Sequence, residues 1–480
     1  MRFRRISLTL GINLCALAAL MLLPALIDLV DNNRDWQAFL VSAMLTFFLG
    51  GLLVFSGIDL ESGEIELKEG FVLTTLSWLV TAGFSALPFV GLGLSFSDAY
   101  LEAMSGLTTT GSTVLAGLDK LPRGILLWRA LLQGLGGIGI VVTAIIMLPF
   151  LRVGGMQLFH TESSDRSEKV LPRSAQLILA IAQIYAGLIV ACALIFGLLG
   201  MTGFDAICHA LTTVSTGGFS THDASFAFFK SPSLEWAAVV FMVLGALPFV
   251  AMIRFTNGHL SEAWRDAQVR GFVGFLAGVS VVLAIWLVET RDLDFLDALR
   301  LATFNVVSIT TTTGFANTDY MQWGPFAIVL VFLLTFIGGC AGSTAGGIKI
   351  YRFQVAGLLI KGHFLSLMTP HRVSPLRYNG RRLPGDVPFS VIAFLAVYMA
   401  TVAFFTLLLA GLGIDLITSL SAAATAVSNV GPGLGDTIGP VGSFAPLPDA
   451  AKWALSAAML LGRLELFTVL VLMRPEFWRD

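Results

Sequence analysis

The sequence TTTTGFANTDY, residues 310–320, places four threonines before a glycine between two long apolar runs. Polar clusters are otherwise rare in this chain, because 56% of its residues are hydrophobic and only 12% are charged. A soluble globular domain carries about 25% charged residues. The mean hydropathy of +0.84 over 480 residues is likewise too apolar for a soluble globular protein. The composition therefore indicates a multi-pass membrane protein, in which such a polar stretch needs a specific physical reason.

Ten stretches are apolar enough to cross a bilayer, which takes about 20 apolar residues per helix. They are residues 6–30, 36–57, 71–94, 123–151, 174–201, 233–254, 269–290, 323–348, 388–413 and 452–473. The first is predicted to be a retained span, because its apolar part exceeds the roughly 7 to 15 residues of a signal-peptide core. Most Lys and Arg residues fall on the side that holds both termini, so the positive-inside rule predicts cytoplasmic termini.

Several classes of protein are disfavoured by what the sequence lacks. The net charge of −2 and the absence of a basic stripe give no sign of nucleic-acid binding. The four cysteines have no CxxC spacing, so neither a disulfide framework nor a zinc site is indicated. A membrane-embedded enzyme would need paired aspartates, HExxH or a Ser/His pair within the spans. None is found in the sequence, which predicts a chain without enzymatic activity or an organic cofactor.

The threonine-rich stretch is one of four related segments. They read SDAYLEAMSGLTTTGST (97–113), FDAICHALTTVSTGGFST (204–221), DALRLATFNVVSITTTTGFA (297–316) and LITSLSAAATAVSNVGPGLG (416–435). Aligned on one glycine each, they place Gly111, Gly218, Gly314 and Gly431 in register. A single copy is more often a helix C-cap or a turn. Four copies between paired spans instead indicate a fourfold repeat of span, short helix, glycine loop and span.

Irregular backbone at membrane depth is tolerated only where it is buried in protein or lines a water-filled path. Four such loops therefore imply one shared axis, where glycine lets backbone carbonyls crowd together. A ring of carbonyls can replace the hydration shell of a monovalent cation. Each short helix would point its C-terminus at the axis and add about half a negative charge there. We expect the ion to meet Thr109, Thr110, Gly111, Thr216, Gly217, Gly218, Thr312, Thr313, Gly314, Asn429, Val430 and Gly431.

These strings resemble the membrane subunit of Trk/Ktr-type bacterial potassium uptake systems, and more closely the TrkH/TrkG branch. The resemblance covers essentially the whole chain. It is carried by SGLTTTG (105–111), GGFSTHDAS (217–225), FIGGCAGSTAGGIK (336–349), NVGPGLG (429–435) and GRLELFTVLVLMRPEFW (462–478). The sixth span reads GALPFVAMIRF (245–255) where many members of the family carry an Asn and an aromatic residue, which leaves details of the second repeat's inner helix open.

The resemblance implies an all-α membrane fold and a K⁺-conducting pore built from four covalently linked M1-P-M2 repeats. The expected units are two N-terminal helices (1–70) and pore repeats at 71–173, 174–268, 269–387 and 388–480. It also implies a homodimer in the bacterial cytoplasmic membrane and a cytosolic nucleotide-binding regulatory subunit of the TrkA type. K⁺ would be the transported ion.

Two features predict a gate. The eighth span is interrupted by GGCAGSTAGG, residues 338–347, whose five glycines exceed what a helix-packing seam requires. The resemblance places there an intramembrane loop that obstructs the pore below the filter. Arg463 lies nearly central in the last apolar run, where a charge needs a partner or water. The predicted gating residues are Gly338, Gly339, Gly342, Ser343, Gly346, Gly347, Lys349 and Arg463.

We expect Arg463 to hydrogen-bond free carbonyls of the 338–347 segment and to act as an electrostatic gate latch. The alternative is that Arg463 forms an ion pair with a carboxylate on another helix. Glu465 is expected on a different helix face. Lys349, Arg352 and the basic stretch 372–382 fit either the positive-inside signal or a docking surface for the regulator. The alternative function is a proton- or sodium-coupled cation symporter without channel-like conduction.

Overall fold

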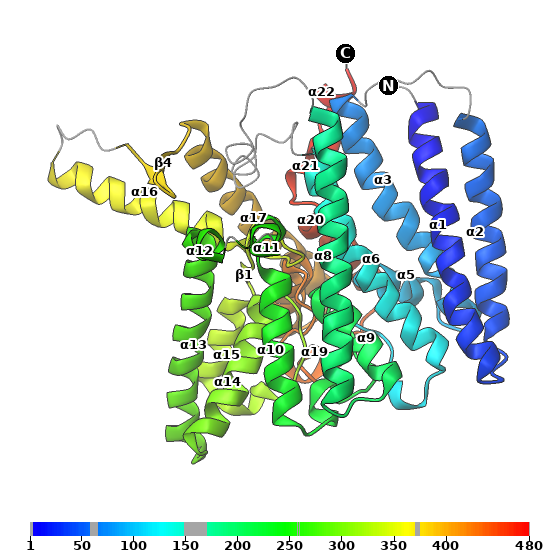
Figure 1. Cartoon of the computed structure of the whole chain (residues 1–480), viewed down its shortest axis with the longest axis horizontal. Helices are drawn as coiled ribbons and strands as arrows, with labels where there is room; N and C mark the ends of the chain where they lie inside the picture. The colour runs from blue at the N-terminus through cyan, green and yellow to red at the C-terminus, as the bar shows by residue number, and fades with distance from the viewer. Residues whose placement is uncertain are drawn as a thin grey trace.

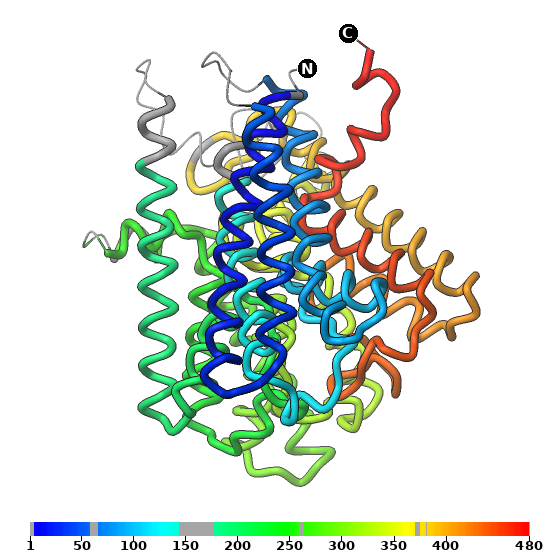
Figure 2. Tube along the Cα trace, turned by 90° about the vertical axis from the view of Figure 1, so that its right-hand side faces the viewer, coloured from blue at the N-terminus to red at the C-terminus, as the bar shows by residue number. Residues whose placement is uncertain are grey.

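The computed structural model describes residues 3–57, 66–147, 170–256, 258, 260–369 and 375–479. Its long helices run nearly side by side, and both termini lie at the same end of the molecule (Figures 1 and 2). Seven of the described helices are long and apolar enough to cross a membrane without a sharp bend. They are α1 (Phe3–Val30), α2 (Trp36–Gly57), α3 (Leu67–Ser85) continuing as α4 (Leu87–Gly91), α6 (Arg123–Met147), α8 (Val170–Leu198), α13 (Ala267–Arg291) and α17 (Asp386–Gly411). The predicted end of the fourth span, 148–151, lies outside the described residues.

Four shorter helices precede the four aligned glycines. They are α5 (Phe96–Leu107), α9 (Gly203–Val214), α14 (Phe295–Thr310) and α18 (Leu416–Ser428). Each begins at a side-chain N-cap, in which Ser95, Thr202, Asp294 and Asp415 accept a backbone N–H of the first turn. Such caps satisfy one of the orphan donors at a helix start. The predicted short pore helices are therefore present in all four repeats, as 12 to 16 residues.

Three of the four inner spans are broken. In the second repeat α10 (Pro232–Ala246) meets α11 (Phe249–Thr256) at 105°, and in the fourth α20 (Asp449–Arg463) meets α21 (Phe467–Leu470) and η4 (Val471–Met473) at 107°. In the third, α15 (Pro325–Leu334) stops after ten residues and the chain runs extended to α16 (Ile350–Met368). Reading 233–254 and 452–473 as simple spans was therefore wrong. Pro248 has no N–H to continue the helix, which explains the first break.

The remaining elements are short. They are η1 (Leu118–Lys120), η2 (Ser225–Phe228), α12 (Leu260–Arg265), η3 (Tyr320–Trp323), β1 (Ile337–Gly338), β2 (Ile348–Lys349), β3 (Arg377–Tyr378), β4 (Arg381–Arg382), α19 (Gly435–Ile438) and α22 (Pro475–Trp478). The strands form two two-stranded pairs, β1 parallel to β2 and β3 antiparallel to β4.

Two large apolar clusters hold the helices together. One joins α1, α3, α5 and α6 to α17, α18 and α20, and includes Leu17, Trp128 and Leu455. The other joins α8, α9, α10, α13, α14 and α15, and includes Phe196 and Leu283. The first thus unites the N-terminal helices with repeats one and four, and the second unites repeats two and three. The four glycine loops lie where the two halves meet.

Candidate ion-conducting site

The backbone takes the same unusual path after every pore helix. Thr109, Thr216, Thr312 and Asn429 all have φ between 50° and 58°. Two residues later Gly111, Gly218, Gly314 and Gly431 have φ between 79° and 107°. Positive φ is uncommon for residues other than glycine. The fourfold repeat read from the sequence is therefore also a repeat of backbone conformation.

The four glycines form a closed ring. A Cβ atom placed on Gly111 would meet the carbonyl oxygen of Gly217, and the same relation links each repeat to the next. The pairs are Gly111 with Gly217, Gly218 with Thr313, Gly314 with Val430, and Gly431 with Thr110. All four distances from the added Cβ to the carbonyl oxygen are below 3.0 Å, and real Cβ atoms essentially never come so close to another heavy atom. Because the fourth repeat returns to the first, the loops surround one axis, and glycine is required at each step.

Most carbonyl oxygens of this ring have no hydrogen-bond donor among the described residues. This applies to Thr109, Thr216, Thr312 and Asn429, and to Thr110, Thr313 and Val430. These residues are all buried. Buried backbone carbonyls are normally paired, so a set of buried carbonyls without protein partners is available to coordinate another group. A ring of such oxygens provides the ligands that a dehydrated monovalent cation needs.

The ring is not fully symmetric. Gly217 differs from its counterparts because its carbonyl accepts a hydrogen bond from Gln133 Nε2 at 2.6 Å. In the fourth repeat Asn429 replaces threonine and donates through Nδ2 to Thr110 Oγ1 at 3.0 Å. The second repeat is thus fixed by the inner helix of the first, and the fourth repeat is tied directly to the first. These contacts make the four repeats chemically distinct.

The predicted gating segment lies against the base of this ring. Gly346 N donates to Thr312 Oγ1 at 2.6 Å, Gly347 N donates to the Ser428 carbonyl at 2.8 Å, and Thr344 Oγ1 accepts from Thr216 Oγ1 at 3.2 Å. Repeats two, three and four therefore each contact it. Within the segment, Ser343 Oγ donates to the Cys340 carbonyl. Gly342 and Gly347 have positive φ, and an added Cβ at Gly338, Gly339 or Gly346 would overlap neighbouring backbone.

The segment is anchored on its far side by the break between α10 and α11. Cys340 N donates to the Ala246 carbonyl at 2.9 Å, and Thr344 N donates to the Gly245 carbonyl at 3.2 Å. Phe249 N in turn donates to the Gly342 carbonyl at 3.0 Å. Ending α10 at Ala246 frees the donors and acceptors that these bonds use. The departure noted at GALPFVAMIRF is therefore the anchor of the gating segment.

Arg463 makes the type of contact that the sequence predicted. Its Nη1 donates to the Thr344 carbonyl at 2.8 Å, and its Nη2 donates to the Gly136 carbonyl of α6 at 3.2 Å. The side chain is buried, and no carboxylate of the described residues lies within ion-pair distance of it. It is the last residue of α20 rather than the centre of a continuous helix. One guanidinium thus joins the gating segment to the first repeat.

An ion pair between Arg352 and Glu465, which the sequence did not predict, lies two residues further along the chain from Arg463. Glu465 has φ of 57° in the break after α20, and its Oε2 lies 2.6 Å from Arg352 Nη2. The Arg352 guanidinium also lies 3.6 Å from the centre of the Phe394 ring. Arg352 is buried, so it is not part of a docking surface, and Lys349 turns back to donate to the Ala345 carbonyl. The expectation that Glu465 lies on another helix face was wrong, because α20 ends at Arg463 and does not continue through residue 465.

On the face away from the termini, outer loops of the first two repeats are joined. His222 Nδ1 hydrogen-bonds to Asp119, and its ring stacks on Phe228 with centroids 3.5 Å apart. The hydrogen bond from His222 holds the pKa of the Asp119 carboxyl below its ordinary value. This contact fixes the outer loops above the ring.

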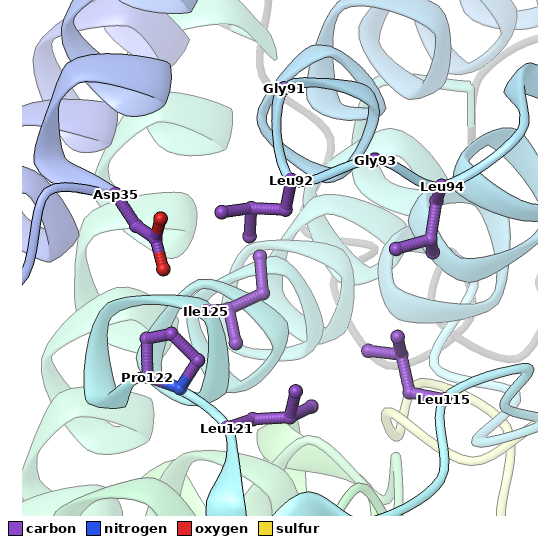
Figure 3. A pocket seen from close by; sticks show the side chains of 9 residues that line it. All are labelled: Asp35, Gly91, Leu92, Gly93, Leu94, Leu115, Leu121, Pro122 and Ile125. Atoms are coloured by element: carbon purple, nitrogen blue, oxygen red, sulfur yellow. The ribbon is translucent and has the colours of Figure 1, made fainter.

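A separate cavity of about 510 Å³ lies beside this face (Figure 3). It is lined mainly by apolar side chains of the first repeat, including Leu92, Leu115 and Ile125, with one carboxylate, Asp35, at its edge. None of the predicted ion-binding or gating residues lines it. The cavity is therefore distinct from the ring.

A fourfold loop ring, broken inner helices and membrane-length helices together define a multi-pass pore-loop membrane protein. A family model described as TrkH, cation transport protein, matches residues 35–479, and the chain belongs to this family. The membership confirms the resemblance inferred from the sequence motifs. It also confirms that the chain is not an enzyme, because the family is one of transport proteins.

Individual relatives match along the whole chain. The Trk system potassium uptake protein TrkI of Halomonas elongata is 48% identical and covers 100% of this chain and 98% of its own length. TrkH of Escherichia coli K12 is 36% identical, with full coverage of both chains. The crystal structure of the potassium transporter TrkH from Vibrio parahaemolyticus matches with a TM-score of 0.90 at 36% identity over 100% of both chains. The predicted all-α fold is thereby confirmed.

Proposed function

We propose that this chain takes up K⁺ across the bacterial cytoplasmic membrane through the four-glycine ring. The observation that carries the proposal is the ring of buried carbonyl oxygens, most of which have no donor among the residues that the structure describes. The ends of the four pore helices add negative potential there, which favours a cation and disfavours an anion. The names of the full-length relatives, which are potassium uptake proteins, support K⁺ as the ion. Both termini would lie in the cytoplasm, in agreement with the positive-inside rule.

The gating part of the proposal places the closed barrier at residues 338–347, directly against the ring. Arg463 holds this segment through the Thr344 carbonyl and adds a positive charge on the ion path. Opening requires the segment to leave Gly245 and Ser428, to which it is hydrogen-bonded, and to leave Arg463, which also binds the Gly136 carbonyl. A cytosolic TrkA-type regulator and a second copy of the chain are the proposed partners. Because only β2 separates the segment from α16, force on α16 would reach the gate.

A coupled symporter is the second candidate. Carriers of that kind usually hold ionisable residues at mid-membrane. The break after α20 brings Glu465 close to Arg352 and thus supplies a half-buried carboxylate that the sequence did not predict. Its pairing with arginine favours a structural role over a proton relay. We therefore rank the gated pore first.

The test is uptake of labelled rubidium into liposomes that contain the purified protein, under an outward potassium gradient. We expect uptake that external K⁺ blocks and Na⁺ does not, and that persists without a proton or sodium gradient. Uptake that requires either gradient would favour the symporter. Folded protein that passes no cation, with or without a regulatory subunit, would contradict both candidates.

A further inference from the structure

One position of the pore helices is used in the same way in three repeats. Glu102, His209 and Asn305 each stand nine residues before the ring glycine of their repeat. All three side chains are completely buried. The fourth repeat has Ala422 at this position. Three buried polar residues of different chemistry at one structural position call for a common explanation.

Each polar side chain reaches the irregular segment just beyond the glycine of its own loop. Glu102 accepts the Val114 N–H at 2.9 Å and the Thr113 hydroxyl at 2.9 and 3.0 Å to its two oxygens. His209 Nε2 lies 2.9 Å from Ser220 Oγ.

In the third repeat Asn305 Nδ2 donates to Asn317 Oδ1 at 2.7 Å. The contacted residues stand two or three positions after the glycine in every case. Each of these three pore helices is therefore fastened to the outer end of its own loop.

The polar side chains and the residues that they contact also bind side chains of other helices. Arg129 pairs with Glu102 at 2.8 Å and also donates to the Ser220 carbonyl at 2.8 Å, which links the first loop to the second. Asn317 Nδ2 donates to Glu235 at 2.9 Å, and Glu235 pairs with Arg300 at 2.6 Å. The contacts are thus parts of buried networks in which the partners are fixed in turn.

The geometry points to Glu102, His209 and Asn305 as positioning residues that hold the ring at the radius required for K⁺, and thereby set its preference over Na⁺. This inference rests on the proposed function. A carbonyl cage discriminates by the number, field strength and spacing of its oxygens, so a loop free to contract would serve the smaller Na⁺ as well. The fourth loop is held differently, because Ser421 Oγ accepts the Leu434 N–H at 3.0 Å.

His209 gives the sharpest test, because its two nitrogens have separate tasks. Nδ1 lies 2.9 Å from the Asp205 carbonyl, which can only accept, so Nδ1 carries the proton. In the neutral ring Nε2 is then the acceptor for the Ser220 hydroxyl. The asparagine amide can take the place of Nδ1, but it is too short to reach Ser220. The longer glutamine side chain can place its amide near the position of Nε2. H209N therefore removes the contact to the loop, and H209Q restores it.

The experiment measures the K⁺ to Na⁺ permeability ratio of the full chain in liposomes, together with its melting temperature. We expect H209N to lower the ratio about tenfold, on the order expected for one buried hydrogen bond. H209Q should stay within about twofold of the unsubstituted protein. S220A removes the same contact and also the hydrogen bond from His222 N to Ser220 Oγ at 3.1 Å, so it should lower the ratio at least as much as H209N. The double variant H209N/S220A should fall no further than S220A, because the contact between His209 and Ser220 is lost in both single variants.

An unchanged ratio in folded, conducting H209N would overturn the inference, as would effects of H209N and S220A that simply add. If H209N does not fold, Asn317→Ala applies the same test to the third repeat, where Glu235 keeps its Arg300 partner. A lower melting temperature with an unchanged ratio would show a purely structural role. Absence of any K⁺ preference in the unsubstituted protein would contradict the proposed function itself, so the two failures are distinguishable.

Discussion

Replacing Arg463 with glutamine should raise the basal cation flux of the protein without its regulator by about tenfold or more. Two hydrogen bonds to a charged group, each worth roughly 1.5–3 kcal/mol, hold the guanidinium against the Thr344 and Gly136 carbonyls. Glutamine has similar length up to the amide but cannot bridge both carbonyls, and it removes a positive charge from the ion path. Each 1.4 kcal/mol lost by the closed state shifts the closed-to-open equilibrium about tenfold. Rubidium uptake at zero membrane potential measures the effect.

Two further variants separate the latch from general damage. Arg463→Lys keeps the positive charge, but its single ammonium group cannot bridge both carbonyls as the guanidinium does. We expect its flux to lie between the flux of the unsubstituted protein and that of Arg463→Gln. Arg474→Gln removes an arginine that is exposed near the C-terminus, and flux should stay unchanged. Unaltered flux in well-folded Arg463→Gln would contradict the latch.

Gly314→Ser should abolish most of the preference for K⁺ over Na⁺. Gly314 has φ of 81°, which costs a residue with a side chain roughly 1–2 kcal/mol, and its Cβ would overlap the Val430 carbonyl. The carbonyl has to move away, and the ring then loses its fixed geometry. We expect at least about a tenfold fall in the K⁺ to Na⁺ ratio, which corresponds to about 1.4 kcal/mol. Competition of unlabelled K⁺ and Na⁺ against labelled rubidium measures this ratio.

The matched control for Gly314→Ser is Gly413→Ser. Gly413 has φ of 86°, but nothing lies within 4 Å of its Cβ position. Gly413→Ser therefore has nearly the same backbone strain as Gly314→Ser, but its Cβ does not overlap a ring carbonyl. A loss of selectivity in both variants would show that strain alone causes it. A Gly314→Ser protein that keeps the K⁺ preference would show that this glycine does not shape an ion site.

Much of the architecture could be predicted from the sequence, because bilayer spans and repeats leave long patterns. Seven of the ten predicted spans correspond to uninterrupted helices. The four pore helices were found by aligning glycines, and the caps Ser95, Thr202, Asp294 and Asp415 could have marked their starts. The breaks after α10 and α20 were missed because hydropathy averages over a window and does not register a local change of direction. Pro248 was the one available signal for the first break.

The site was predictable where backbone conformation depends on residue type, and not where it depends on tertiary contact. Glycine indicated the loops, since it accepts positive φ readily. The positive φ of Thr109, Thr216 and Thr312 could not be predicted, because β-branched residues rarely adopt it. The pairing of Arg352 with Glu465 depends on the break at residues 464–466, where Glu465 and Leu466 both adopt positive φ. No local pattern predicts that conformation for glutamate and leucine. The fastening of each loop through Glu102, His209 and Asn305 likewise becomes visible only once the loops are in place.

The central claim is that the ring of carbonyl oxygens holds K⁺, and the most direct test is to locate a bound ion. Crystals grown with Rb⁺ in place of K⁺ should give an anomalous peak on the ring axis, among the carbonyls of Thr110, Thr313 and Val430. Adding K⁺ should remove the peak, and the same concentration of Na⁺ should not. A peak elsewhere, such as at Glu465, or an empty ring at a Rb⁺ concentration that supports uptake, would contradict the account.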